Sequence, residues 1–170
     1  MVMPMSEYMR GLREKVGTTV VEIPTVSVVI FDANDRVLLV RHHEGNDWTT
    51  PGGMVEPYEI PADAAVRETW EETGLYVALT RIVGVFGGPI CSGTYSNGDK
   101  VSWISTVFAA ERISGTPRPD GDETLEVRYF DRAEVGTVRC KAHARLFVET
   151  AYAGDRATQF QPATWRPSAA

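Results

Sequence analysis

Residues 53–75 read GMVEPYEIPADAAVRETWEETGL, and they carry the strongest structural signal of the chain. Pro61 suits the first turn of a helix, where its missing N–H costs nothing, and Gly74 suits the left-handed residue that ends one. Asp63 falls in the first turn, where the helix dipole favours an anion. The sequence therefore predicts a helix over residues 61–73.

Three carboxylates share one side of that predicted helix. At 100° per residue, Glu71 and Glu72 lie within about 60° of Glu68. Like charges at these spacings repel by roughly 0.2–0.5 kcal/mol per pair, so a cation is expected to compensate them. Clustered carboxylates are the ligands that Mg²⁺ prefers, and substrate phosphates often complete its shell. The alternative for a bare Glu-x-x-Glu-Glu pattern is an ordinary solvated acidic face.

The opposite side of the helix is expected to face the core, because a surface helix buries its least charged stripe. The residues on that side are Ala62, Val66, Thr69 and Trp70.

The spacing of charged residues and glycines around this helix is long and constrained. Five residues separate Gly53 from Glu59, and seven more separate Glu59 from Arg67. This string resembles the Nudix box, in which Gly, Glu, Arg-Glu, an apolar residue, Glu-Glu, Gly and a final apolar residue recur at these spacings. Thr69 stands where an aliphatic residue is usual, and we expect it to pack without touching the carboxylates. The matching residues are Gly53, Glu59, Arg67, Glu68, Glu71, Glu72, Gly74 and Leu75.

This resemblance, on residues 53–75 (the box), implies a fold and an activity. The fold is α+β, a Nudix-type α/β/α sandwich with a mixed β-sheet. The activity is a divalent-metal-dependent pyrophosphohydrolase that cleaves a nucleoside diphosphate linked to a variable moiety, with Mg²⁺ or Mn²⁺ as cofactor.

The resemblance also implies roles for the box residues. Glu68, Glu71 and Glu72 are expected to ligate the metal and act in catalysis, with the backbone carbonyl of Gly53 as a possible further ligand. Two other charged residues are expected to support them by pairing, which fixes the loop against the helix. These supporting residues are Glu59 and Arg67.

A base is needed to activate the attacking water. The family places it either on a box glutamate or on an acidic residue of a downstream loop. Glu123 best matches the downstream position, and Glu126 is the alternative. Both could instead be ordinary surface charges on an edge strand.

Substrate contacts are sought among residues near the box. Arg41, Tyr58 and Tyr95 are the candidates, because aromatic rings in loops can stack a base and an arginine can face phosphate. His42 and His43 follow Arg41, but adjacent strand residues point to opposite sides, so at most one of the two histidines faces the substrate.

The rest of the chain alternates short strands with turns. β-Branched runs predict strands, and the turn residues 32–35 predict a hairpin between two of them. Helices are expected at residues 8–16 and 140–152, a short turn at 131–135, and loops at 86–99 and 113–122. The predicted strands are residues 18–23, 26–31, 37–40, 76–85, 101–110 and 125–130.

Composition narrows the class of protein. The 170 residues are 43% apolar, enough for one substantial core, and we expect an N-terminal helical lead-in (1–17), a single hydrolase domain (18–153) and a polar tail (154–170). No apolar run is long enough to span a bilayer, so a cytoplasmic protein without membrane contact is expected. The net charge of −6 disfavours nonspecific nucleic-acid binding. Two distant cysteines predict neither a disulfide framework nor a zinc site.

Substrate identity stays open at this point. ADP-ribose or a related nucleotide sugar is favoured, and an oxidised or canonical nucleoside triphosphate is the alternative. A non-catalytic nucleotide sensor of the same fold is a different class of function, although sensors commonly lose box carboxylates that this chain keeps. A homodimer formed through the N-terminal helix and first strand is also open.

Overall fold

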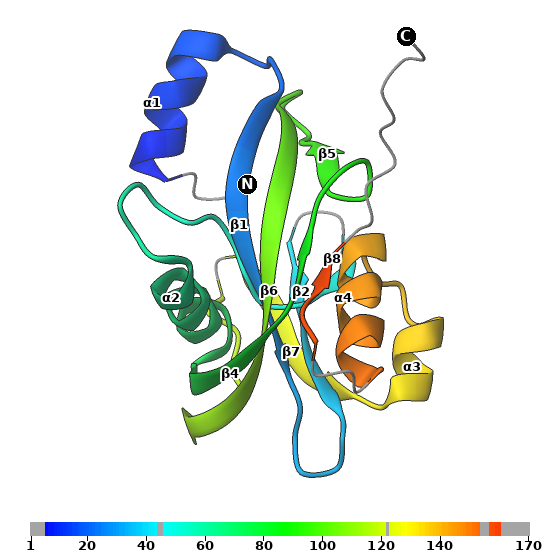
Figure 1. Ribbon diagram of the computed structural model, residues 1–170. Helices are drawn as coiled ribbons and strands as arrows, with labels where there is room; N and C mark the ends of the chain where they lie inside the picture. Colours follow the sequence, from blue (N-terminus) through cyan, green and yellow to red (C-terminus); the bar gives the residue numbers. More distant parts are fainter. Residues whose placement is uncertain (1–5, 44–45, 122, 154–156, 161–170) are drawn as a thin grey trace, which may run out of the picture.

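The computed structural model describes residues 6–43, 46–121, 123–153 and 157–160 (Figure 1). Its elements in chain order are α1 (Glu7–Val16), β1 (Val21–Ile30), β2 (Val37–His42), β3 (Trp48–Thr49), α2 (Pro61–Thr73), β4 (Leu75–Phe86), β5 (Ser92–Thr94), β6 (Lys100–Gly115), β7 (Thr124–Phe130), α3 (Arg132–Thr137), α4 (Ala142–Tyr152) and β8 (Gln159–Phe160).

Strands distant in sequence form the larger of two sheets. β1 pairs in parallel with β6, from Val21 opposite Val101 to Ile30 opposite Ala110. β4 pairs antiparallel with β6, while β5 and β8 add short segments. The smaller sheet has the order β3-β2-β7 and is antiparallel. The larger sheet is therefore mixed, as the fold class requires.

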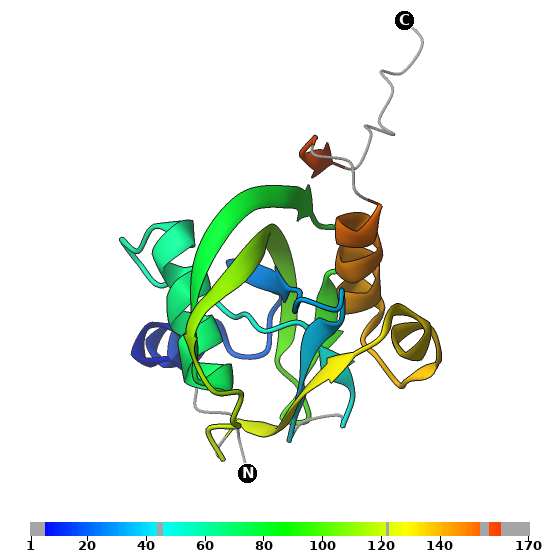
Figure 2. The same cartoon turned by 90° about the horizontal axis from the view of Figure 1, so that it is seen from below.

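Helices cover both sides of these strands. Figure 2 shows α2 on one side and α3 with α4 on the other. On the α2 side, Ala64 packs with Val28 and Leu75, and on the α4 side Phe147 packs with Val29. α1 stands apart from these layers, beside the projecting ends of β1 and β6 (Figure 1). The α/β/α sandwich is confirmed.

The turn predicted at residues 32–35 is present, but the strands on either side of it do not form the predicted hairpin ladder. The two segments meet at a bridge between Phe31 and Val37, next to a turn closed by Asp32. Beyond it, β1 continues beside β6, whereas β2 pairs with β7. A turn brings two neighbouring segments close together. Which strand each one then pairs with depends on how its two faces are buried by distant parts of the chain, and a local sequence pattern does not contain that information.

Several predicted boundaries also change. The strands expected at 18–23 and 26–31 are one strand, β1, that runs through Pro24. β6 extends to Gly115, into a predicted loop, and β5 lies within the loop predicted at 86–99. The turn predicted after β7 is the helix α3, which begins with a reciprocal capping box between Asp131 and Glu134.

The N-terminal helix is present and ends at Gly17, as expected. The predicted tail, residues 154–170, lies mostly outside the described residues, and the division of the chain at 17 and 153 stays a prediction. No helix among the described residues is long and apolar enough to cross a membrane.

Candidate active site

The helix α2 begins and ends where the sequence predicts. Pro61 is its first residue, and Gly74 ends it in the left-handed conformation at φ 66°, with its N–H donated to the Trp70 carbonyl at 2.9 Å. A left-handed residue is readily adopted by glycine, which has no Cβ to clash. Both ends of α2 are thus set by residues of the box itself.

The buried side of α2 differs from the prediction. Trp70 is 48% exposed, whereas Glu72 is 3% exposed. The helix is therefore rotated so that part of its acidic side faces inward, which is possible because polar groups from other elements meet the carboxylates. The residues of α2 that are buried are Ala64, Ala65, Thr69, Glu72 and Thr73. Thr69 is satisfied locally by donating to the Ala65 carbonyl at 2.7 Å.

The buried carboxylate of Glu72 is held from two sides. The Gly52 N–H donates to its Oε2 at 3.0 Å, and His42 Nε2 lies 2.9 Å from its Oε1. Burial lowers the pKa of His42, but the hydrogen bond and charge of Glu72, with the charges of Glu123 and Asp120, outweigh burial and raise it. Helix periodicity gave no sign of these contacts, and alternation along β2 indicated only that at most one of the two histidines could face the site.

Glu68 packs directly against the glycine that opens the box. A Cβ placed on Gly53 would lie 2.5 Å from Cδ of Glu68 and 2.6 Å from both carboxylate oxygens. Burial, and then the negative charge of Glu72, raise the pKa of Glu68 to about 7, against the opposing effect of Arg67. Two carboxylates thus crowd one small region lined by glycine backbone.

Arg67 connects the loop of the box to its helix. Its Nε and one terminal nitrogen bind both oxygens of Glu59 at 2.8 and 2.9 Å, and the latter nitrogen also donates to the Met54 carbonyl. The other terminal nitrogen donates to Glu68 at 2.8 Å and to Glu71 at 3.0 Å. The hydrogen bond from Arg67 lowers the pKa of Glu59. The predicted Glu59–Arg67 pair is present.

The third carboxylate, Glu71, lies at the rim with 55% of its side chain exposed. Across the described ranges, no three acidic, histidine or cysteine side chains stand in a ready-made metal site. The donor set nevertheless fits a hard divalent cation, since the charge of Glu72 is close enough to raise the pKa of Glu68, and the missing Cβ of Gly53 lets the Glu68 carboxylate lie against the backbone. The Gly53 carbonyl accepts from the Val26 N–H at 2.9 Å, and its second lone pair is not used by this bond.

The two downstream acidic residues have different surroundings. Glu126 forms an ion pair with Arg41 at 2.8 Å, so the predicted phosphate-binding arginine is already neutralised. Glu123 accepts the His43 N–H on its carbonyl at 3.0 Å, and its charge acts on His42. Glu123 therefore lies at the end of β2 and β7 that carries the Glu72 contact.

The two candidate tyrosines lie elsewhere. Tyr58 is in the loop of the box, fully exposed, and adopts a left-handed backbone at φ 68°. Tyr95 lies in the turn that precedes β6, with its N–H donated to the Asp99 carbonyl at 2.8 Å. The opposite end of β6, at Gly115, is the one that packs against Gly74. The structure therefore places Tyr95 at the α1 end of the molecule.

Comparisons with a family model, with curated proteins and with solved structures all find relatives of the same kind. The family model described as "NUDIX domain" matches residues 21–149. The "Putative 8-oxo-dGTP diphosphatase" of Bacillus subtilis (strain 168) is 40% identical over 102 residues, which cover 60% of this chain but only 62% of that relative. The "MutT-like protein" of Streptomyces ambofaciens is 27% identical over 153 residues, covering 80% of this chain and 92% of that protein. The solved structure of a "NUDIX hydrolase from Nitrosomonas europaea" has a TM-score of 0.67 at 22% identity, covering 80% and 92% of the two chains.

Proposed function

Because the chain belongs to the Nudix family and is a hydrolase acting on pyrophosphate bonds, we propose that it cleaves a nucleoside diphosphate linked to a sugar, ADP-ribose or a nucleotide sugar. The observation that carries the assignment of the site is the approach of Glu68 and Glu72 around the Gly52–Gly53 backbone. Nucleotide substrates are typical of the family, and members generally depend on a divalent metal.

The box residues would hold the metal. Glu68, Glu71 and Glu72 are the proposed ligands of Mg²⁺ or Mn²⁺, with the Gly53 carbonyl as a further one. A bound cation of this kind neutralises the phosphates and lowers the pKa of water. Arg67 keeps Glu68 and Glu71 oriented while its other edge holds the loop through Glu59, so a ligand geometry is prepared before substrate arrives.

Proton transfer is assigned to Glu123. The attacking water must lose a proton, and a carboxylate at the edge of the site can accept it. Glu126 is the alternative, since its carboxylate is already paired with Arg41 at 2.8 Å. His42 is proposed to hold Glu72 in place through the 2.9 Å contact.

A second candidate substrate is an oxidised nucleoside triphosphate. The name of the Bacillus subtilis relative favours it, and the box would act on either substrate. The residues that contact the group beyond the pyrophosphate decide between the two.

The test is hydrolysis of a panel of nucleoside diphosphate sugars and nucleoside triphosphates with Mg²⁺ or Mn²⁺, followed by chromatography. We expect the wild type to cleave the sugar conjugates best and Glu72→Gln to lose at least a hundredfold in kcat. Glu123→Gln should lower kcat and remove the acidic limb of its pH profile. No turnover of any compound by the wild type would refute the proposal.

A further inference from the structure

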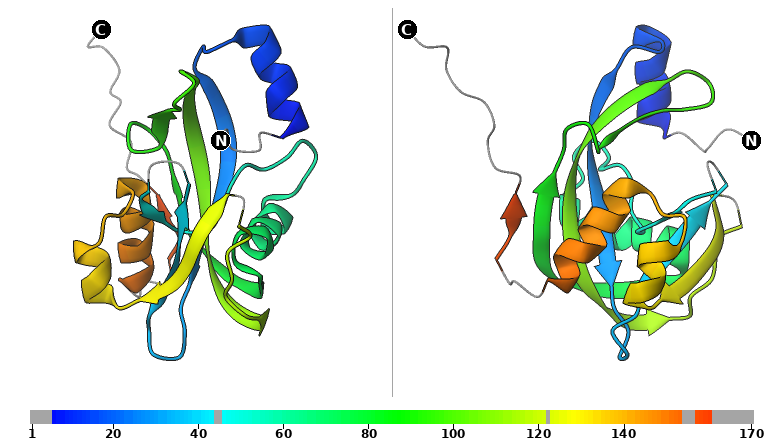
Figure 3. Two further views of the ribbon diagram at one scale, coloured as in Figure 1. Left: turned by 180° about the vertical axis from the view of Figure 1, so that it is seen from behind. Right: turned by 90° about the vertical axis from the view of Figure 1, so that its right-hand side faces the viewer.

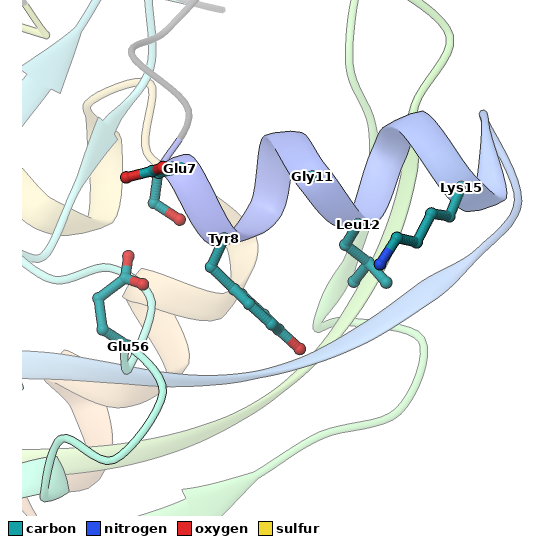
Figure 4. A pocket seen from close by; sticks show the side chains of 7 residues that line it. Glu7, Tyr8, Gly11, Leu12, Lys15 and Glu56 are labelled. Carbon is teal, nitrogen blue, oxygen red and sulfur yellow. The ribbon is translucent and has the colours of Figure 1, made fainter.

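A groove lies between α1 and the loop that precedes α2. Its volume is about 680 Å³, within the range of small-molecule sites. Figure 4 shows Glu7 on α1 and Glu56 on the facing loop, with Tyr8 and Leu12 projecting from the same side of α1. α1 precedes the residues matched by the family model, so most of this groove is built by residues outside the matched region. The lining residues are Ser6, Glu7, Tyr8, Gly11, Leu12, Lys15 and Glu56.

α1 forms a fixed wall because one buried arginine ties it to the sheet. Arg13 is 9% exposed and donates to the carbonyls of Gly17, Thr19 and Lys100 at 3.0, 2.7 and 2.8 Å. It also forms an ion pair with Asp99 at 3.6 Å. Charge-assisted hydrogen bonds are among the strongest of their kind, so the position of α1 over the groove is set by the fold.

The other wall of the groove is connected to the catalytic carboxylates. The Glu56 N–H donates to Glu59 at 3.0 Å, Glu59 is bound by Arg67, and Arg67 binds Glu68. Figure 3 (left) shows α1 above the loop that leads into α2. The loop that carries Glu56 is thus held by the same hydrogen-bonded residues that orient Glu68.

The lining favours an uncharged ligand rich in hydroxyl groups. The Glu7 and Glu56 carboxylates accept hydrogen bonds when ionised, and the Lys15 ammonium donates them, so the lining suits hydroxyl groups, which can do both. The Tyr8 ring, 51% exposed, offers a flat apolar face to the C–H groups of a sugar ring. Among the described residues, no heavy atom outside the backbone of α1 and the two neighbours of Gly11 lies within 4 Å of a Cβ placed on Gly11, so a larger side chain has room there.

We propose that this groove binds the sugar of a nucleoside diphosphate sugar and so sets the preference for that class over nucleoside triphosphates. The proposal rests on the proposed function, because it takes the pyrophosphate to be held at the box. It assigns specificity to α1 and Glu56 and leaves the chemistry to the carboxylates of α2.

Gly11→Leu tests this by filling the groove. The added side chain enters open space, and replacement of a helical glycine does not weaken the helix. Glu14→Leu is the matched control, because it puts the same side chain on an exposed position of α1 that does not line the groove. We expect Gly11→Leu to reduce the preference for ADP-ribose over dGTP, as the ratio of kcat/KM values, at least tenfold through KM. Tyr8→Ala should act in the same direction, and Glu14→Leu should keep the wild-type ratio.

Equal ratios in Gly11→Leu and Glu14→Leu would overturn the groove proposal while leaving the hydrolase assignment intact. If the wild type cleaves neither compound, the proposed function fails, and calorimetric binding of ADP-ribose with Mg²⁺ then decides the groove separately. A Kd at least tenfold weaker in Gly11→Leu than in the wild type and Glu14→Leu supports it, and equal values overturn it.

Discussion

Alanine substitutions at the two adjacent glycines of the site should affect different properties: Gly53→Ala should lower activity, and Gly52→Ala should lower stability. At Gly53 the new Cβ would meet the Glu68 carboxylate at 2.5–2.6 Å, where ordinary contact begins near 3.4 Å, so the carboxylate must move by about 1 Å. The far end of a side chain can make that movement at low cost to folding. Displacement of a catalytic group by about 1 Å typically lowers the rate by about 100-fold. Gly53→Ala should therefore lose about two orders of magnitude in kcat/KM while its stability changes by about 1 kcal/mol or less.

Gly52→Ala is the comparison that separates the two effects. Its φ is 147°, and its Cβ would lie 2.2 Å from the backbone carbonyl oxygen of Val26, which cannot move alone. Overpacking together with an unfavourable backbone should cost about 3 kcal/mol or more, or about 10 °C in Tm. Hydrolysis assays and thermal unfolding on both variants give the answer. Wild-type kcat/KM in Gly53→Ala, or an equal loss of Tm in both variants, would refute the reasoning.

Three further predictions concern charge. Mg²⁺ should raise the Tm of the wild type but have a much smaller effect on Glu72→Gln, because a ligand that binds only the native state stabilises it; calorimetry with and without EDTA checks this, and equal shifts would contradict it. Arg67→Gln should lose about 2 kcal/mol in metal-free urea unfolding, because Glu59, Glu68 and Glu71 lose their shared partner, and an unchanged urea midpoint would count against it. Burial, and then the charge of Lys141, lower the pKa of His143 from 6.5 to about 4. Between pH 6.5 and pH 4 the unfolded chain therefore binds a proton at His143 that the folded chain does not. The free energy of unfolding should fall by about 2 kcal/mol from pH 7 to pH 5 for this reason. Urea titrations at the two pH values check this, because the contribution of His143 to the fall should be absent in His143→Phe.

Local signals in the sequence predicted the helix of the site well. Pro61 and Gly74 mark the ends of α2 because their backbone preferences hold whatever the rest of the chain does. The Glu59–Arg67 pair was also predictable, since the resemblance names both residues and their opposite charges make a contact the simplest use of them. The predicted roles of both residues remain to be tested.

Long-range relations were not predictable in the same way. Glu72 is buried because the N–H of Gly52 and the ring of His42, both distant in sequence, satisfy its carboxylate. Helix periodicity alone assigns Glu72 to the solvent side of α2 and Trp70 to the core side, because it takes no account of these distant partners. Likewise, no local pattern pairs β1 with β6 or places α1 opposite Glu56, because those neighbours are chosen by the burial of whole faces.

The parallel pairing of β1 with β6 also bears on how the chain can be made. Val21 lies opposite Val101, eighty positions later, and the pairing ends with Ile30 opposite Ala110. On a ribosome that adds roughly 5–20 residues per second, β1 therefore waits for several seconds without its partner. During that interval an unpaired backbone edge and the apolar side chains of β1 are accessible to other chains, among them Val26, Val28, Val29 and Ile30. The order of synthesis thus makes the N-terminal third of this protein the part for which a chaperone would matter most.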